Sequence, residues 1–313
     1  MIDLSSRPNL KALVTDQLEF WPEHERYLSR SLESRDEQLL DVSEDVSGLI
    51  LRIARNTSED LSVWWRDYKY LCEDVVLPEE LFFRRHGKYR LSTFEDANRE
   101  CYANAAMMGR YMNGLLLSSV FWENHARALS YYALKFLPRL AAGARHLEIG
   151  PGHGLQLYLA ARHPNVGSAT GWDISPTSIE KTRAALESME VADLVALELR
   201  DLFAPKNHGD LGRFDSVVLS EILEHLEDPV AALCSVAEVI PPGGHLWVNV
   251  PANSPAPDHI FLFESLEHAE DIVEQAGFRV LDSEAYAMSG ASLERAAKHK
   301  LSISCVIAAQ RPE

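Results

Sequence analysis

HLEIGPGHGL, residues 146–155, decides the fold: an apolar run leads into a turn with three alternate glycines, and a helical pattern follows. Glycine lets the backbone adopt left-handed conformations and pass close beneath a ligand, and a helix that starts there presents N–H groups at its first turn. We therefore predict a strand over 146–149, a ligand-binding turn over 150–154 and a helix from Leu155. The alternative is a tight strand-to-helix turn that binds nothing.

The chain after Gly143 repeats this plan of a short apolar run, a turn and a helical pattern. Strands that alternate with crossover helices predict a Rossmann-like, mostly parallel seven-stranded α/β sheet with helices on both faces, over residues 141–313. We expect the last strand to be antiparallel. The predicted strands are HLEIG, SATGWDI, LVALELRD, FDSVVLS, GHLWVNV, FRVLDSEAYA and LSISCVIAAQ.

The first part of the chain has a helical pattern instead. Apolar residues recur at spacings of three and four, as in LLDVSEDVSGLILRI (39–53), and Gly and Pro are scarce. We predict an all-helical domain over 1–140 that caps the substrate site. Ser92-Thr93-Phe94-Glu95 predicts a capping box, and the helix it opens is expected to continue past Leu115.

Composition excludes several classes of partner. The 313 residues, 46% hydrophobic and 25% charged, are enough for two globular domains. A formal charge of -17, from 47 acidic and 30 basic residues, opposes binding to nucleic acid and to anionic membranes. The N-terminus lacks a leader pattern, and the four cysteines lack metal or redox spacing, so we predict reduced thiols and a cytoplasmic location.

An acidic residue on the second predicted strand narrows the ligand of the turn. Asp173 lies 23 residues after Gly150, close to the ~20-residue offset at which an acid meets ribose hydroxyls in nucleotide-binding folds. Together they predict a ligand that contains a nucleoside. The spacing G-x-G-x-G differs from the G-x-G-x-x-G of dinucleotide enzymes, so a dehydrogenase is the weakest alternative.

With Glu148 ahead of the glycines, residues 148–154 read E-x-G-x-G-x-G, and here the chain resembles the class I S-adenosylmethionine-dependent methyltransferases. EHLEDP followed by PPGG is typical of the ubiquinone-biosynthesis and related small-molecule methyltransferases, and about the last 170 residues share the resemblance. The matching stretches are GWDIS (171–175), RDLF (200–203), SEILEHLEDP (220–229) and PPGGHLWVNVP (241–251).

The resemblance implies a site for S-adenosylmethionine, which leaves as S-adenosylhomocysteine. Glu148 and the turn backbone are expected to hold the methionine end, Asp173 the ribose hydroxyls and Asp201 the adenine amino group, with Leu202 or Phe203 against the ring. Alternatively, the two aspartates cap the helices that follow their strands. The whole expected cofactor shell is Glu148, Gly150, Pro151, Gly152, Gly154, Asp173, Ile174, Asp201, Leu202 and Ser220.

Two histidines are the catalytic candidates. The segment NVPANSPAPDHIFLF (249–263) follows the fifth predicted strand at its carboxyl end, where open α/β sheets bind ligands. His259 within it is our preferred general base, because a neutral imidazole accepts a proton near pH 7; the alternative is a histidine bonded to the loop backbone. His225 is equally suited to bracing its turn. No metal is predicted, although these histidines with Glu221 or Asp258 could bind one.

The helical domain is expected to supply substrate contacts. The basic run RRHGKYR (84–90) is either a solvated loop or a clamp for a substrate carboxylate or phosphate, or for an acidic carrier protein. A homodimer could form through faces such as 115–120. The expected substrate-binding residues are Tyr111, Asn113, Trp122, His125, Asn253 and Arg90.

The sequence thus predicts an S-adenosylmethionine-dependent methyltransferase that acts on a small metabolite, in specialised or natural-product biosynthesis. O-, N- and C-methylation all remain open, because only a hydroxyl or carbon acceptor requires a base. Two other classes of function are retained: an enzyme that uses the same cofactor for a different reaction, and a non-catalytic module that binds it.

Overall fold

The computed structural model describes residues 2–58, 60–204 and 209–313. The chain folds into two compact units. The helical unit holds the chain up to Ser130 together with 254–259 and 286–303, and the sheet unit holds 131–253, 260–285 and 304–313. The predicted division at residue 140 treats both domains as continuous. The compact units differ from that division, because two segments from the C-terminal half group with the helices.

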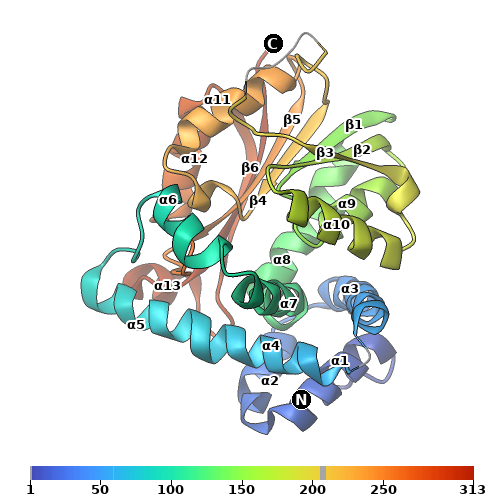
Figure 1. Cartoon of the computed structure of the whole chain (residues 1–313), viewed down its shortest axis with the longest axis vertical. Helices are drawn as coiled ribbons and strands as arrows, with labels where there is room; N and C mark the ends of the chain where they lie inside the picture. The colour runs from blue at the N-terminus through green and yellow to red at the C-terminus, as the bar shows by residue number, and fades with distance from the viewer. Residues whose placement is uncertain (1, 59, 205–208) are drawn as a thin grey trace. The chain divides into compact units, whose positions relative to one another are not determined.

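Helices make up almost all of the helical unit, as the spacing of apolar residues predicts (Figure 1). In the helix over 37–57, the predicted apolar stripe through Leu39, Val46, Ile50 and Ile53 is buried. No helix within the described ranges is long and apolar enough to cross a membrane. The α-helices are α1 (Pro8–Phe20), α2 (Glu25–Glu33), α3 (Glu37–Thr57), α4 (Ser62–Tyr70), α5 (Leu77–His86), α6 (Phe94–Ala97), α7 (Ala105–Phe121), α8 (Glu123–Tyr131) and α13 (Leu293–His299).

The start of α6 differs from the predicted capping box. Thr93, not Ser92, is the N-cap, and its Oγ1 accepts a hydrogen bond from the backbone N–H of Asp96 at 3.2 Å. The predicted continuous helix is also wrong, because Asn104 caps a new helix, α7, by accepting from the N–H of Met107 at 3.1 Å. An Asn side chain competes for backbone N–H groups and so favours a helix start over a helix interior.

The sheet unit confirms the predicted α/β fold. Its seven strands lie in the order β3-β2-β1-β4-β5-β7-β6, and β3, β2, β1, β4 and β5 pair in parallel. The strands are β1 (Ala144–Ile149), β2 (Val166–Asp173), β3 (Val195–Leu199), β4 (Ser216–Ser220), β5 (His245–Ala252), β6 (Arg279–Ala287) and β7 (Ile303–Gln310), and the helices between them are α9 (Leu155–Arg162), α10 (Pro176–Ser188), α11 (Pro229–Val239) and α12 (Leu266–Gln275).

The strand order reverses between β1 and β4. Because parallel crossovers are right-handed, this reversal places α9 and α10 on one face of the sheet and α11 on the other. Open α/β sheets bind their ligands at such a reversal, outside the carboxyl ends of the strands, which here are β1 and β4. The last strand is antiparallel to β5, as predicted, because the N–H of Arg311 after β7 donates to the carbonyl of Gly244 before β5 at 2.9 Å.

Candidate functional site

The turn between β1 and α9 has the backbone conformation that its glycines predict. Gly150, Gly152 and Gly154 have φ angles of 64°, 53° and 73°, in the left-handed region that favours glycine. At Gly150 the protein itself also excludes a side chain, because a Cβ there would lie 2.3 Å from Cδ1 of Ile222. Thr182 Oγ1 donates to the carbonyl oxygen of Gly152 at 2.6 Å and fixes the turn.

Glu148, the acid before the turn, is a buried carboxyl group whose second oxygen lacks a partner. Glu148 is only 3% exposed, and its Oε2 has no hydrogen-bond partner among the residues that the structure describes. Burial raises the pKa of Glu148 to about 8, against the opposing effect of the Leu157 backbone N–H at the start of α9. A positively charged ligand group beside this carboxyl would favour its ionised form and give Oε2 a hydrogen-bond donor.

Asp173 ends β2, next to the glycine turn, since Ile149 pairs with Trp172 in the parallel register. Asp173 Oδ1 accepts from the N–H of Ser175 at 2.8 Å, and burial raises the pKa of its carboxyl above the ordinary value. The N-cap of α10 is Ser175, which accepts from the N–H of Ser178 at 3.2 Å. The alternative that Asp173 caps α10 is therefore excluded.

Two exposed apolar side chains follow the carboxyl ends of β2 and β3. Ile174 is 61% exposed and Phe203 is 51% exposed. The two strand ends are joined by a hydrogen bond from the N–H of Arg200 to the carbonyl of Asp173 at 2.8 Å. Asp201 is exposed and its Oδ1 accepts from the N–H of Phe203 at 2.8 Å. Leu202 is buried at 9% exposure, so Phe203 is the better of the two predicted partners for a flat ring.

The carboxyl ends of β4 and β5 contain a hydrogen-bonded polar pair. Asn249 on β5 lies opposite Ser220 on β4, and its Nδ2 donates to Ser220 Oγ at 3.1 Å and to Glu221 Oε1 at 3.0 Å. Glu221 has a φ of 55°, which is rare outside glycine. Ser220 was expected in the cofactor shell and Asn249 begins the segment 249–263 that was expected at the site, but no sequence pattern indicates their hydrogen bond, which joins residues 29 positions apart.

His153, between two of the turn glycines, is a residue that sequence reasoning missed. Its Nδ1 is shielded from solvent and has no hydrogen-bond partner within the described part of the chain. Burial lowers the pKa of His153 to about 4, so the imidazole is neutral near pH 7. The sequence feature that could have identified it is its position between Gly152 and Gly154.

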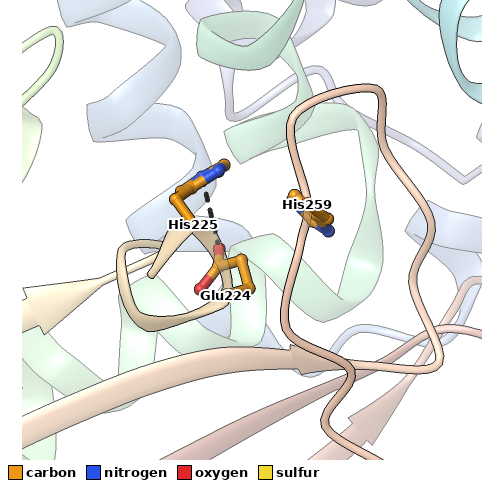
Figure 2. Close-up of side chains that lie close together, drawn as sticks. All are labelled: Glu224, His225 and His259. Atoms are coloured by element: carbon orange, nitrogen blue, oxygen red, sulfur yellow. Dashed lines mark ion pairs between the residues drawn. The ribbon is translucent and has the colours of Figure 1, made fainter. Parts of the chain in front are cut away.

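His225 lies in the short 3-10 turn Leu223–His225 that follows β4 (Figure 2). Its Nε2 is 3.7 Å from Oε1 of the buried Glu224, and its backbone N–H donates to the carbonyl of Ile222 at 3.1 Å. Figure 2 also draws His259, on the segment after β5. These residue types bind divalent metal ions as well as protons.

His259 belongs to the helical unit, within segment 254–259. It is buried, its Nδ1 lies 2.7 Å from the carbonyl oxygen of Ser254, and its ring meets the ring of Tyr89 edge-on with 5.8 Å between centroids. Because a carbonyl only accepts, Nδ1 must carry the hydrogen, which leaves the Nε2 lone pair of a neutral imidazole to accept a proton. Next to it, Tyr111 Oη donates to Asp258 Oδ1 at 3.3 Å.

Besides Tyr111, three of the predicted substrate residues have partners inside the helical unit. Asn113 Nδ2 donates to the buried carboxylate of Asp67 at 2.9 Å, and Trp122 Nε1 donates to the hydroxyl of Tyr68 at 3.1 Å. His125 Nδ1 lies 2.9 Å from Ser118 Oγ, and burial lowers the pKa of His125 to about 4.

Arg90 and Asn253 also have partners within their own units. Arg90 Nε is 2.9 Å from Glu79 Oε1, and its guanidinium lies over the ring of Phe82, so this cation is neutralised within the helical unit. Asn253 follows β5 with a φ of 49°, and its Nδ2 donates to the carbonyl of Glu264 at 2.8 Å. Its Oδ1 is buried and unpaired within the described ranges.

Part of the chain is similar in sequence to known methyltransferases. The ubiquinone biosynthesis O-methyltransferase of Xanthomonas oryzae pv. oryzae (strain PXO99A) is 35% identical over 117 residues, 37% of this chain and 46% of that protein. The protein of the same name from Xanthomonas axonopodis pv. citri (strain 306) is 34% identical over 130 residues, 41% of this chain and 50% of its own. The chain thus spans about half the length of the curated relatives it matches.

Among solved structures, the apo S-adenosylmethionine-dependent methyltransferase SibL has a similar fold, with a TM-score of 0.55, 18% identity, and coverage of 81% of this chain and 75% of its own. A family model described as a methyltransferase domain matches residues 121–287, more than half of the chain. The chain therefore belongs to the methyltransferase-domain family.

Proposed function

We propose that this protein transfers the methyl group of S-adenosylmethionine to a small-molecule acceptor. The observation that carries the proposal is the left-handed glycine turn between the buried Glu148 and α9, with Asp173 at the end of the neighbouring strand. The ubiquinone biosynthesis O-methyltransferases among the relatives support a hydroxyl group as the first acceptor to test.

The cofactor supplies an electrophilic methyl group on a positively charged sulfur. Glu148 would hold the amino group of the methionine end, because its Oε2 is a buried acceptor, and Asp173 would accept from the ribose hydroxyls. Ile174 and Phe203 would cover the adenine ring, with Asp201 at the ring's amino group. The backbone of the turn and Pro151 and Ser220 complete the proposed cofactor shell.

For the acceptor, we propose His259 as the general base, since the Ser254 carbonyl orients its imidazole with Nε2 as the acceptor of the proton. His225 is the second candidate. The helical unit, including Tyr111, Asn113, Trp122, His125 and Arg90, is proposed to determine acceptor specificity. A cytoplasmic location, a homodimer, a carrier-bound acceptor and a role in specialised biosynthesis remain predictions.

Calorimetric titration with S-adenosylmethionine, S-adenosylhomocysteine and NAD tests the proposal. We expect binding of the first two alone, weakened about 5- to 150-fold in Asp173→Ala because charged hydrogen bonds worth ~1–3 kcal/mol are lost. Asp193→Ala, at an exposed acid near β3, is the matched control and should bind normally. Binding of NAD alone, or of none of the three, would overturn the proposal.

A further inference from the structure

Asn249, on β5, is a buried residue for which the proposed function gives no role. Its amide nitrogen donates to Ser220 Oγ at 3.1 Å and to Glu221 Oε1 at 3.0 Å, and its backbone carbonyl accepts from the N–H of Glu221 at 2.8 Å. A carboxylate only accepts hydrogen bonds, so the contact with Glu221 requires the amide to present Nδ2 on that side, and the orientation of the amide is set. The remaining side-chain atom, Oδ1, has a fixed position.

Oδ1 of Asn249 is a buried hydrogen-bond acceptor. The residue is 7% exposed, and Oδ1 has neither solvent contact nor a hydrogen-bond partner among the described residues. Buried polar atoms in folded proteins almost always have partners, and one without a partner costs ~1–3 kcal/mol. The two N–H groups of Asn249 already bond to Ser220 and Glu221. Its Oδ1 can therefore accept a hydrogen bond from a donor group of a ligand.

The residues bonded to Asn249 connect its side chain to the cofactor turn over 150–154. Glu221, which Asn249 holds, has a φ of 55°, a conformation that costs ~1–3 kcal/mol and occurs preferentially at functional sites. The following residue, Ile222, meets the glycine turn at Gly150, where its Cδ1 would be 2.3 Å from an added Cβ. Asn249 is thus connected to the cofactor turn through two consecutive residues.

We propose that Asn249 binds the methyl acceptor, and that its Oδ1 accepts a hydrogen bond from an O–H or N–H group of that molecule. Ser220 and Glu221 orient the amide for this contact. The carboxylate of Glu221 beside it disfavours an anion, so the part of the acceptor that lies at β5 is a hydroxyl or amino group. This inference rests on the proposed function and specifies the acceptor class for the same site.

Phenol and its methyl ether, anisole, are matched probes for this contact, because they differ mainly in one donor hydrogen. Their binding to the S-adenosylhomocysteine complex of the full chain is measured by ligand-observed NMR titration. For the wild type we expect phenol to bind about tenfold or more tightly than anisole, the effect of one hydrogen bond to a buried acceptor. In Asn249→Leu, of similar size, the preference should fall to about twofold or less.

Asn165→Leu is the control, because Asn165 bonds to the carbonyl of Leu140 at the amino end of β2, away from the strand ends that form the site. It should keep the wild-type preference. Aniline and N,N-dimethylaniline repeat the comparison in the wild type alone, so the test does not depend on the variant's folding.

Equal affinities within both probe pairs in the wild type, including no binding at all, would overturn the role of Asn249, as would a preference that survives in Asn249→Leu. Calorimetry with S-adenosylhomocysteine separates the two levels of inference. If the wild type binds it but does not discriminate the probes, only the role of Asn249 fails; if the wild type does not bind it, the proposed function fails.

Discussion

Gly150 and Ile222 are in direct contact: a Cβ added to Gly150 would lie 2.3 Å from Cδ1 of Ile222. The turn after β1 and the turn after β4 are therefore packed against each other at the point where the strand order of the sheet reverses. A glycine of the cofactor motif is thus required by the protein's own packing in addition to any ligand.

We expect Gly150→Ala to lower the free energy of unfolding by more than the cost of placing an alanine in a left-handed backbone conformation. A left-handed alanine costs ~1–2 kcal/mol, and the contact with Ile222 adds a clash. Urea denaturation measures the loss. Gly143→Ala is the control, since Gly143 also has a positive φ, of 81°, but an added Cβ there meets no atom within 4 Å. Equal losses in the two variants would show that Ile222 yields without cost.

The buried carboxyl of Glu148 predicts a pH-dependent stability. Burial raises its pKa from the ordinary value of 4.5 to about 8 in the folded state, so between these values the folded state binds more protons than the unfolded state. The contribution of Glu148 to stability is therefore full below about pH 4.5 and is lost as the pH rises towards about 8.

Glu148→Gln removes this titration. From about pH 5 to about pH 8, the free energy of unfolding of the variant should rise relative to wild type by on the order of 1 kcal/mol or more. Denaturation of both proteins across this range measures the difference. A difference that does not change with pH would show that Glu148 is ionised throughout, against the raised pKa.

Replacing either of two glycines in α7 with alanine is expected to change stability in opposite directions. A Cβ on Gly114 would lie 2.7 Å from Cβ of Leu71 and 3.0 Å from the carbonyl oxygen of Asp67, so α7 and the chain around α4 approach too closely for alanine. Gly109 meets no atom within 4 Å. We expect Gly109→Ala to stabilise by about 0.5–1 kcal/mol, through helix propensity, and Gly114→Ala to destabilise by about 1–3 kcal/mol. Thermal unfolding of both variants gives the comparison; stabilisation by both would contradict the close approach.

His259→Gln should lower turnover with a hydroxyl acceptor by about 10²–10⁴-fold, because a general base is lost, while the affinity for S-adenosylhomocysteine changes by less than about threefold. Single-turnover transfer of a labelled methyl group and calorimetry measure the two quantities. Tyr89→Phe is the control for a purely structural role, since the Tyr89 hydroxyl accepts from the N–H of Ser254 at 3.2 Å and supports the same segment. Equal losses of turnover in both variants would assign His259 to bracing the segment.

Much of the sheet unit could be predicted from the sequence because local patterns determine it. The strand and helix pattern after Gly143, the conformation of the turn at 150–154 and the place of Asp173 at the end of β2 depend on residues within a few positions of one another. The antiparallel last strand and the cofactor that we propose were predicted from the order of motifs in the same part of the chain. The spacing of glycines and acidic residues predicts backbone geometry because the conformation of a turn depends on residues that are close together in the chain.

Contacts between distant residues were decided only by the tertiary structure. Asn113, a predicted substrate residue, donates its amide to Asp67, 46 positions away, and Arg90 pairs with Glu79. The bond from Asn249 to Glu221 joins residues 28 positions apart and could not be read from either segment alone. Sequence by itself determined the alternation of strands and helices, the turn and the cofactor class, whereas packing decided which polar groups are already paired and which still need a ligand, because burial and pairing depend on what the rest of the chain brings beside each group.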